Sequence, residues 1–291
     1  MNLNNSPSVW LDLTQEELDA AYDQAVWAPN MEAVIARLAD KSHRARARLG
    51  DPLQHAYGEQ QDERLDIYRA EGTGRPVMIF VHGGSWRVGT AANNAFAAAM
   101  FVDAGIHFVV PDFSPVDAFS GDLAGMIEQL RRAVAWVHAH AVDFGGDANN
   151  IYLTGFSSGG HLAGVLLTLE WPSYGLPADI IKGALLCSGM YDLTPVALSF
   201  RREFLDLDPD SIAALSPLAN VGRINVPVIV ATGTHESPEF QRQAQEFTRE
   251  LAAAGKTVQP MAVTGHNHFE IIETLASRDS PLSRKVLALI G

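Results

Sequence analysis

Apolar residues in this chain recur in short continuous runs, each bounded by turn residues and separated by stretches with a helical period. Continuous apolar runs of roughly four to eight residues are typical of strands that are buried on both faces of a sheet. Such strands are predicted over 77–81, 107–110, 151–154, 183–187, 226–232 and 258–263. One further segment, 64–69, alternates polar and apolar residues as an edge strand does.

Amphipathic stretches lie between most of these strands and predict helices over about 92–104, 121–140, 159–170 and 238–254. Strands that alternate with helices imply right-handed crossovers and a mainly parallel sheet flanked by helices. Two more helices are predicted before the sheet. Thr14 to Glu17 form a capping-box pattern that opens a helix to about Gln24, and Asn30 is expected to cap a second helix that ends near Arg48.

The length of 291 residues suits one large α/β domain and is short for two complete ones. We therefore expect a single domain over 1–291. Residues 1–50 are predicted to form an N-terminal helical extension. Prolines interrupt the alternation over 193–218 and indicate an insertion of short helices. The extension and the insertion are expected to form a cap at the rim of the sheet.

The net charge bears on the kind of partner, and the single cysteine and the lack of long apolar runs bear on the location of the protein. A net charge of -13, from 21 basic and 34 acidic residues, predicts neither a nucleic acid nor a membrane as partner, because phosphates would be repelled. The single cysteine, Cys187, lies in an apolar run and is expected to be a buried, inert thiol. Residues 1–10 show no signal-peptide pattern, and no apolar run reaches about 18 residues, so we expect a cytoplasmic protein.

The segment Gly155-Phe156-Ser157-Ser158-Gly159 follows a predicted strand and precedes a predicted helix. It matches the G-x-S-x-G pattern of a nucleophile elbow, in which a serine sits on a sharp turn above the sheet. The small glycines on either side let the backbone turn tightly enough to expose the hydroxyl. Glycine and serine also occur together in ordinary loops, so the interpretation of Ser157 as a nucleophile depends on the residues that accompany it.

A second turn, His82-Gly83-Gly84-Ser85-Trp86, follows the predicted strand 77–81. Backbone N–H groups in a turn at this place are free to point at an oxyanion. We predict that the N–H groups of Gly84, Ser85 and Ser158 form the oxyanion hole. His82 is expected to hold the turn by a side-chain hydrogen bond and to have no catalytic role.

A serine hydroxyl needs a base to take its proton, and on this kind of fold the chain order is serine, acid, histidine. His268 lies after the last strand, directly before a helical run, and is the predicted base; His266 is the alternative. Glu236 lies in the loop after strand 226–232 and is predicted to orient the imidazole. Asp192, after the preceding strand, is the alternative acid. No pair among the other histidines has the spacing of a zinc site, so no metal is predicted.

Five segments, taken in order, resemble the kynurenine formamidase (arylformamidase) branch of the α/β-hydrolases. They are 82–86, 155–162, 188–195, 235–243 and 268–273. The likeness runs from about Leu13 to the carboxyl terminus, and the H-G-G-x-W and S-P-E-F-x-R-Q segments are its most selective parts. The resemblance implies an α/β-hydrolase fold and a catalytic triad of Ser157, Glu236 and His268. It therefore selects His268 over His266.

The chain departs from the usual family pattern at a few positions. Glu236 stands where aspartate is more usual, and its extra methylene requires a loop slightly farther from the imidazole. Ser85 stands where tyrosine is common. Phe156-Ser157-Ser158 replaces the frequent His-Ser-Ala, and 110–115 differs from the usual Tyr-x-Leu-x-Pro pattern. Apart from the change at Glu236, these departures touch the acyl pocket and its rim more than the catalytic groups.

The resemblance implies a cofactor-independent serine hydrolase that forms an acyl-enzyme on Ser157. The lead substrate is an N-formyl arylamine such as N-formylkynurenine, which would place the enzyme in tryptophan catabolism. A carboxylesterase with small acyl preference is the alternative, and a ligand-binding module on an inactive hydrolase scaffold is a third interpretation. Four aromatic residues are candidates for the wall of the substrate site: Trp86, Phe113, Phe119 and Phe156. The expected partners are a small-molecule substrate and, by default, a second copy in a homodimer.

Overall fold

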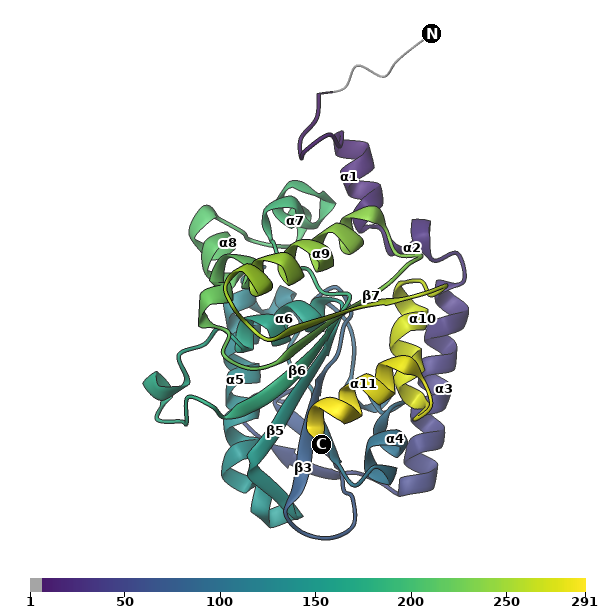
Figure 1. Cartoon of the computed structure of the whole chain (residues 1–291), viewed down its shortest axis with the longest axis vertical. Helices are drawn as coiled ribbons and strands as arrows, with labels where there is room; N and C mark the ends of the chain where they lie inside the picture. Colours follow the sequence, from purple (N-terminus) through teal and green to yellow (C-terminus); the bar gives the residue numbers. More distant parts are fainter. Residues whose placement is uncertain (1–6) are drawn as a thin grey trace.

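The computed structural model describes residues 7–291, and an eight-stranded sheet lies at the centre of that part of the chain (Figure 1). The strands lie across the sheet in the order β1-β2-β4-β3-β5-β6-β7-β8. β2 is antiparallel to both of its neighbours, and every pair from β4 to β8 is parallel. The strands are β1 (Leu53–Ala56), β2 (Arg64–Tyr68), β3 (Arg75–Val81), β4 (His107–Pro111), β5 (Gly146–Phe156), β6 (Ile181–Cys187), β7 (Val228–Gly233) and β8 (Val258–Val263).

Helices cover both faces of the sheet (Figure 1). α5, α6 and α9 pack on one face, whereas α4, α10 and α11 pack on the other, with α3 alongside α4 and α10. The α-helices are α1 (Gln15–Tyr22), α2 (Gln24–Trp27), α3 (Met31–Leu49), α4 (Ala98–Asp103), α5 (Leu123–His140), α6 (Ser158–Leu166), α7 (Thr194–Leu198), α8 (Pro209–Leu215), α9 (Pro238–Ala253), α10 (His268–Glu273) and α11 (Pro281–Ile290). The 3₁₀ helices are η1 (Ala91–Asn94), η2 (Val116–Phe119), η3 (Ala141–Phe144), η4 (Trp171–Tyr174), η5 (Phe200–Glu203), η6 (Pro217–Arg223) and η7 (Thr274–Ala276). The α/β-hydrolase architecture expected from the sequence is confirmed.

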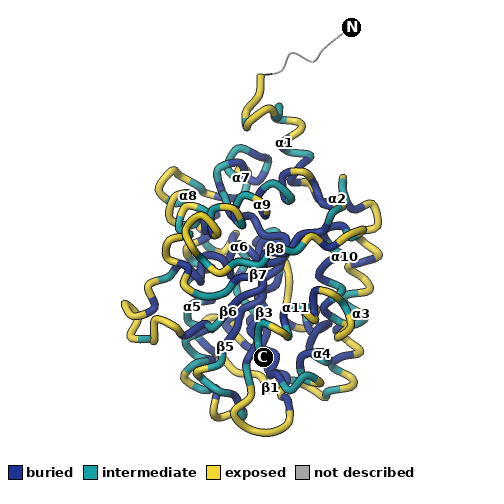
Figure 2. Tube along the Cα trace, viewed as in Figure 1, coloured by how far each residue is buried: buried dark blue, intermediate teal, exposed yellow. Residues whose placement is uncertain are grey.

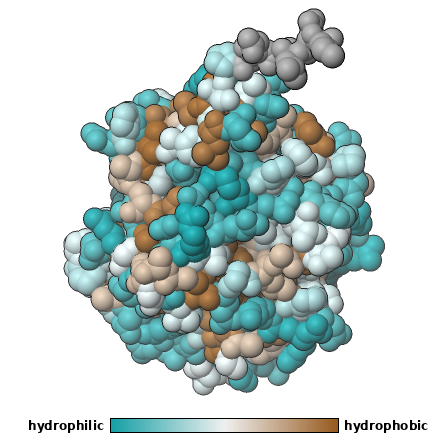
Figure 3. Space-filling view, turned by 45° about the horizontal axis from the view of Figure 1, so that its top comes forward, coloured by the Kyte–Doolittle hydropathy of each residue, from teal (hydrophilic) through white to brown (hydrophobic). Residues whose placement is uncertain are grey.

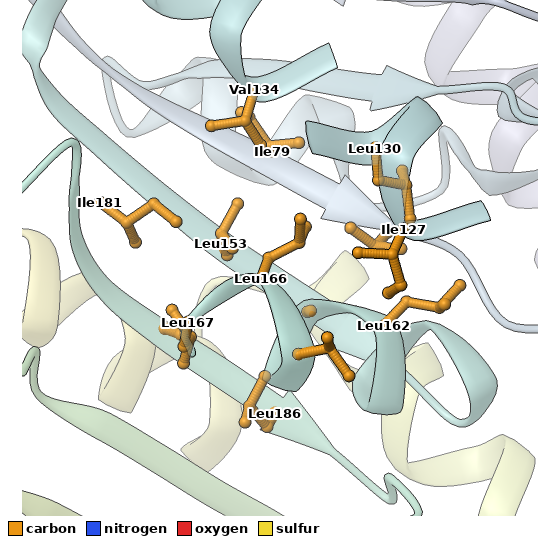
Figure 4. Close-up of a cluster of buried hydrophobic side chains, with 14 of the residues drawn as sticks. Ile79, Ile127, Leu130, Val134, Leu153, Leu162, Leu166, Leu167, Ile181 and Leu186 are labelled. Carbon is orange, nitrogen blue, oxygen red and sulfur yellow. The ribbon is translucent and has the colours of Figure 1, made fainter. Parts of the chain in front are cut away.

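The central strands divide their side chains between two cores. In β3, Val77, Ile79 and Val81 belong to the core that α5 and α6 cover, whereas Met78 and Phe80 belong to the core on the opposite face. Figure 4 shows the first of these cores, where side chains of α5 and α6 meet those of β3, β5 and β6. Figure 2 shows the central strands buried along most of their length. Burial on both faces explains why the central strands are continuous apolar runs in the sequence.

The two edges of the sheet differ from the prediction. The predicted edge strand 64–69 is wrong in its position, because β2 lies between β1 and β4 and only Arg64 of that strand is exposed. The polar Asp66 is buried in this strand, where its carboxylate has two partners. Gln54 Nε2 donates to Oδ1 at 2.8 Å, and Arg46 Nη1 lies 3.7 Å from Oδ2. β1 is the true edge strand, and all of its residues are exposed. At the opposite edge, β8 is partly exposed, so the prediction that it is buried on both faces is also wrong.

The predicted N-terminal helices are present as α1 and α3. The capping box between Thr14 and Glu17 is confirmed, with both reciprocal hydrogen bonds formed. Asn30, however, makes no capping hydrogen bond to α3. Its side chain donates to Glu270 at 2.7 Å and accepts from Asn267 at 2.7 Å, so it ties α3 to α10. The Asn30 prediction is therefore wrong because a tertiary contact replaces the local one.

The predicted insertion over 193–218 contains α7, η5, α8 and the start of η6. α7 packs against α1, which also contacts α9, at the end of the sheet to which the parallel strands point (Figure 1). The grouping of these helices into a cap on a single domain stays a prediction from the sequence.

Candidate active site

Ser157 lies between β5 and α6 in a backbone conformation that is rare for a residue with a side chain, with φ 55° and ψ -124°. Its N–H donates to the carbonyl of Cys187 at 2.9 Å. A Cβ atom on Gly155 would lie 2.2 Å from the carbonyl oxygen of Gly159, and one on Gly159 would lie 2.1 Å from that of Val81. Strand and helix therefore approach each other so closely that both positions require glycine.

We expect Gly159→Ala to lower the free energy of unfolding by about 3 kcal/mol or more, because its methyl group would be forced against backbone that cannot move away. Gly222→Ala is the matched control. A Cβ at Gly222 meets nothing within 4 Å, so the same substitution should change stability by about 0.5 kcal/mol at most. Urea unfolding followed by tryptophan fluorescence measures both. Equal stabilities for the two variants would contradict the close approach of strand and helix.

The structure brings Ser157, His268 and Glu236 together at the carboxyl ends of the strands. The Ser157 Oγ lies 2.9 Å from His268 Nε2, and His268 Nδ1 lies 2.8 Å from Glu236 Oε2. In the tautomer that suits these partners, Nδ1–H donates to the carboxylate and Nε2 accepts from the hydroxyl. All three side chains are buried. His268 is also the first residue of α10, whose capping box at Asn267 fixes the start of the helix.

Glu236 is held by three donors besides His268. Its Oε1 accepts from the N–H of Gly233 at 2.6 Å, from Ser188 Oγ at 2.6 Å and from Thr232 Oγ1 at 3.1 Å. These bonds occupy one carboxylate oxygen and leave Oε2 directed at His268. Sequence reasoning missed all three donors. Their signal is positional, since Ser188 directly follows β6 and the other two end β7, the neighbouring strand.

The two alternative residues lie elsewhere. Asp192 accepts from the N–H of Thr194 at 2.8 Å, at the start of α7. The Nδ1 of His266 lies 2.8 Å from the carbonyl oxygen of Thr264. Within residues 7–291, neither side chain hydrogen-bonds to Ser157, His268 or Glu236, so the contact network joins the residues that the resemblance implies.

Three phenyl rings enclose the imidazole of His268. Phe156 and Phe240 each have their ring centroid 4.9 Å from that of His268, and Phe269 lies at 5.2 Å. Phe156 was a predicted wall residue, whereas Phe240 and Phe269 were not. The rings exclude water from the imidazole, and a low local dielectric strengthens its hydrogen bonds to Glu236 and Ser157.

The glycine turn after β3 packs directly against the nucleophile elbow. A Cβ on Gly83 would lie 3.1 Å from the Cβ of Ser157. Gly84 and Ser85 both have positive φ, of 126° and 54°. Within the described chain, the N–H groups of Gly84, Ser85 and Ser158 donate to no acceptor. Unpaired N–H groups beside a serine hydroxyl are what an oxyanion requires.

A cavity of about 30 Å³ lies beside Ser158, and Gly83, Trp86 and Phe113 are among the residues that line it. Phe119, the last predicted wall residue, does not line this cavity. Its ring packs over Gly125 of α5, where an added Cβ would lie 2.3 Å away. The four predicted aromatic residues therefore do not form one wall: Trp86 and Phe113 line the cavity, Phe156 contacts the imidazole of His268, and Phe119 packs on the first turn of α5.

Two buried histidines support the site from behind. His82 stacks on Phe113 at 4.3 Å, and its Nδ1 lies 2.9 Å from the carbonyl oxygen of Gly83. His161 accepts from Trp86 Nε1 at 3.2 Å through Nδ1, and its Nε2 lies 2.8 Å from the carbonyl oxygen of Leu215. Burial lowers the pKa of each imidazole to about 4, so both are neutral at pH 7.

Cys187 is fully buried, as predicted, and burial raises the pKa of its thiol. In the part of the chain that the structure describes, no group of three or more histidine, cysteine, aspartate or glutamate side chains is arranged to hold a metal ion. Over the same residues, no helix combines the length and the apolar character that crossing a bilayer needs.

Comparison with known proteins agrees with this geometry. The family model described as BD-FAE matches residues 65–171, which contain both the glycine turn and the elbow. The kynurenine formamidase of Danio rerio is 31% identical over 98% of this chain and 99% of its own length. That of Salmo salar is 30% identical, with the same coverage of 98% and 99%.

Solved structures show the same fold. A protein from Silicibacter sp. TM1040, provisionally described as a thioesterase, has a TM-score of 0.79 and 27% identity, covering 94% of this chain and 98% of its own. The esterase of Pyrobaculum calidifontis has a TM-score of 0.68 and 18% identity, with coverage of 89% and 91%. Full-length similarity, the fold and the geometry around the elbow lead to one conclusion: this chain is a hydrolase and belongs to the kynurenine formamidase family of the α/β-hydrolases.

Proposed function

We propose that this enzyme cleaves small amides or esters through an acyl-enzyme on Ser157, with N-formyl arylamines such as N-formylkynurenine as its substrates. The hydrogen-bonded chain from Ser157 through His268 to Glu236 is the observation that carries the proposal. A buried base within hydrogen-bond reach of a strained serine, and itself oriented by a carboxylate, is the arrangement that activates an alcohol for acyl transfer.

In the proposed mechanism, Ser157 Oγ attacks the formyl carbon while His268 Nε2 accepts the hydroxyl proton. The N–H groups of Gly84, Ser85 and Ser158 stabilise the negative charge on the carbonyl oxygen. His268 then donates its proton to the arylamine nitrogen as the C–N bond breaks, which leaves a formyl ester on Ser157. Water, deprotonated by His268, attacks that ester and releases formate.

The size of the cavity beside Ser158 supports a small acyl group. A cavity of about 30 Å³ has room for only about two water-sized groups, so it suits formyl better than a long acyl chain. The leaving group also favours this substrate class, because an arylamine is expelled from the tetrahedral intermediate more easily than an alkylamine. We also propose that α1 and the helices within 193–218 cap this site; a cytoplasmic location and a homodimer stay predictions from the sequence.

A carboxylesterase with small acyl preference is the second candidate, because it would use the same triad and the fold is shared with the Pyrobaculum calidifontis esterase. The formamidase would cleave an amide bond best, whereas the carboxylesterase would cleave an ester bond best. Both are expected to accept a small acyl group.

Steady-state kinetics on N-formylkynurenine, its N-acetyl analogue, p-nitrophenyl acetate and p-nitrophenyl butyrate tests the proposal. We expect N-formylkynurenine to be hydrolysed, and the change from formyl to acetyl to lower kcat/KM by about 10- to 200-fold, the usual effect of one extra carbon in a fitted pocket. A preference for the esters by orders of magnitude would contradict the formamidase proposal and support the esterase. Binding without turnover of any substrate would indicate an inactive scaffold.

A further inference from the structure

Arg201, in η5, is a charged side chain that the proposed chemistry does not use. It is only 4% exposed. Its Nη2 donates to the carbonyl oxygen of Tyr22 at 3.0 Å, whereas its Nε is buried and finds no hydrogen-bond partner in the part of the chain that the structure describes. Among residues 7–291, no carboxylate forms an ion pair with this guanidinium within 4.0 Å. A buried cation without a counter-ion is unfavourable, so its presence needs an explanation.

Neighbouring charges show how unusual this is. Arg242, on α9, donates through Nε and Nη2 to both carboxylate oxygens of Glu239, at 2.7 Å and 2.8 Å. Arg201 has no such partner. Asp23 is exposed, and its carboxylate accepts from the N–H of Ala25 at the start of α2. Burial lowers the pKa of Arg201 to about 10, so the group is still charged at neutral pH.

On one side, the ring of Trp86 lies between the guanidinium and the cavity beside Ser158. The Arg201 Cζ lies 5.6 Å from the centroid of the Trp86 ring. Trp86 lines the cavity beside Ser158 and donates through Nε1 to His161. His161 lies one turn beyond Ser157 on α6, and its N–H donates to the Ser157 carbonyl at 3.1 Å.

On the other side, the same guanidinium faces the base across two rings. Its Cζ lies 5.8 Å from the centroid of the Tyr22 ring, and that ring lies 5.9 Å from Phe240, which contacts His268. Arg201 is thus linked through aromatic rings to both the nucleophile elbow and the base, and through a hydrogen bond to Tyr22 at the end of α1. Figure 3 shows this end of the molecule brought forward, with separate apolar patches set among polar residues.

We propose that Arg201 binds a carboxylate on the leaving-group side of the substrate, remote from the bond that is cleaved. The inference rests on the proposed function and narrows it to N-formyl arylamines that carry an acid group. A substrate whose formyl carbon meets Ser157 and whose aryl group extends past Trp86 would bring its far end to the guanidinium. There the carboxylate would supply the missing counter-ion in a charge-assisted hydrogen bond with the guanidinium.

The test compares two formamides that differ only in charge: N-formylkynurenine and its α-carboxamide. We expect Arg201→Gln to lower the ratio of kcat/KM for the acid to that for the amide about 100-fold, mainly through KM, because a hydrogen-bonded ion pair is lost. Arg202→Gln is the matched control. It removes the same charge one residue away, from an exposed side chain, and should leave the ratio as in the wild type.

A purely structural role for Arg201, in which it only fastens α1 through the Tyr22 carbonyl, would lower turnover of both formamides equally. An unchanged ratio in a folded Arg201→Gln variant would therefore overturn the inference. Folding is checked by Tm and by fluorophosphonate labelling of Ser157. If Arg201→Gln does not fold, Arg201→Met decides, because it keeps a long unbranched side chain but removes the charge: a fall in the same ratio supports carboxylate binding and an unchanged ratio overturns it.

Failure of the proposed function would look different, because the wild-type enzyme would then hydrolyse neither formamide. In that case the pair 3-(4-acetoxyphenyl)propanoate and its carboxamide tests Arg201 alone, since both are acetate esters and only the first carries a charge on its leaving group. A ratio that falls in Arg201→Gln and not in Arg202→Gln would keep the carboxylate site, and an unchanged ratio would overturn it.

Discussion

Ser157→Ala is expected to lower kcat about 10⁶-fold, whichever amide or ester is the substrate, because loss of the nucleophile leaves only the oxyanion donors and binding to accelerate the reaction. The fold should survive. Within residues 7–291 the Ser157 hydroxyl bonds only to His268, and strand and helix approach each other closely at Gly155 and Gly159 without any contribution from the serine side chain. Kinetics under saturating substrate measure the loss of turnover, and Tm checks the fold. Mass spectrometry after fluorophosphonate treatment shows whether Ser157 is the labelled residue.

Ser173→Ala is the matched control, because Ser173 is an exposed serine whose hydroxyl, among the described residues, donates only to the carbonyl oxygen of Glu170. It should retain wild-type kcat and a labelled Ser157 peptide. If Ser157→Ala itself retained labelling at wild-type rate, another nucleophile would carry the reaction and the assignment of Ser157 would fail.

Glu236→Gln is expected to lower kcat about 10⁴-fold with little change in stability, the effect known for the corresponding change of acid to amide in a serine triad. The amide has the size of the carboxylate but cannot stabilise the imidazolium that forms when His268 takes the proton. Ser188, Thr232 and Gly233 donate to Oε1, so the amide oxygen should take that position and turn its NH₂ group towards His268 Nδ1. That orientation favours the wrong tautomer.

Two companion variants make this measurement specific. Asp192→Asn changes the rival carboxylate to an amide whose oxygen still accepts from Thr194, so kcat should stay within about threefold of wild type. Glu236→Asp keeps the charge but withdraws it by one methylene, so its kcat should fall between those of wild type and Glu236→Gln. If Asp192→Asn lost as much activity as Glu236→Gln, the assignment of Glu236 as the acid of the triad would be contradicted.

The parts of the fold that could be predicted depend on neighbours along the chain. The buried central strands could be recognised from their continuous apolar runs, and the helices from their period. The edges could not be predicted in the same way. Whether 64–69 is an edge strand depends on whether another strand pairs with its free side. That strand is β1, whose residues are all exposed, so it has no apolar pattern by which it could be predicted. Likewise, Asn30 has the right side chain for a cap, yet contacts with α10 compete for it.

The sequence alone determined the elbow, because close contact between backbone atoms only a few residues apart excludes a side chain at Gly155 and makes a tight turn at Ser157. It also supplied the candidate base and acids at the ends of strands. Only the tertiary structure decided which carboxylate meets which histidine, since Glu236 lies 32 positions and Ser157 lies 111 positions from His268. Their distances depend on the order of strands in the sheet. The unpaired charge of Arg201 likewise became visible only once distant aromatic residues had enclosed it.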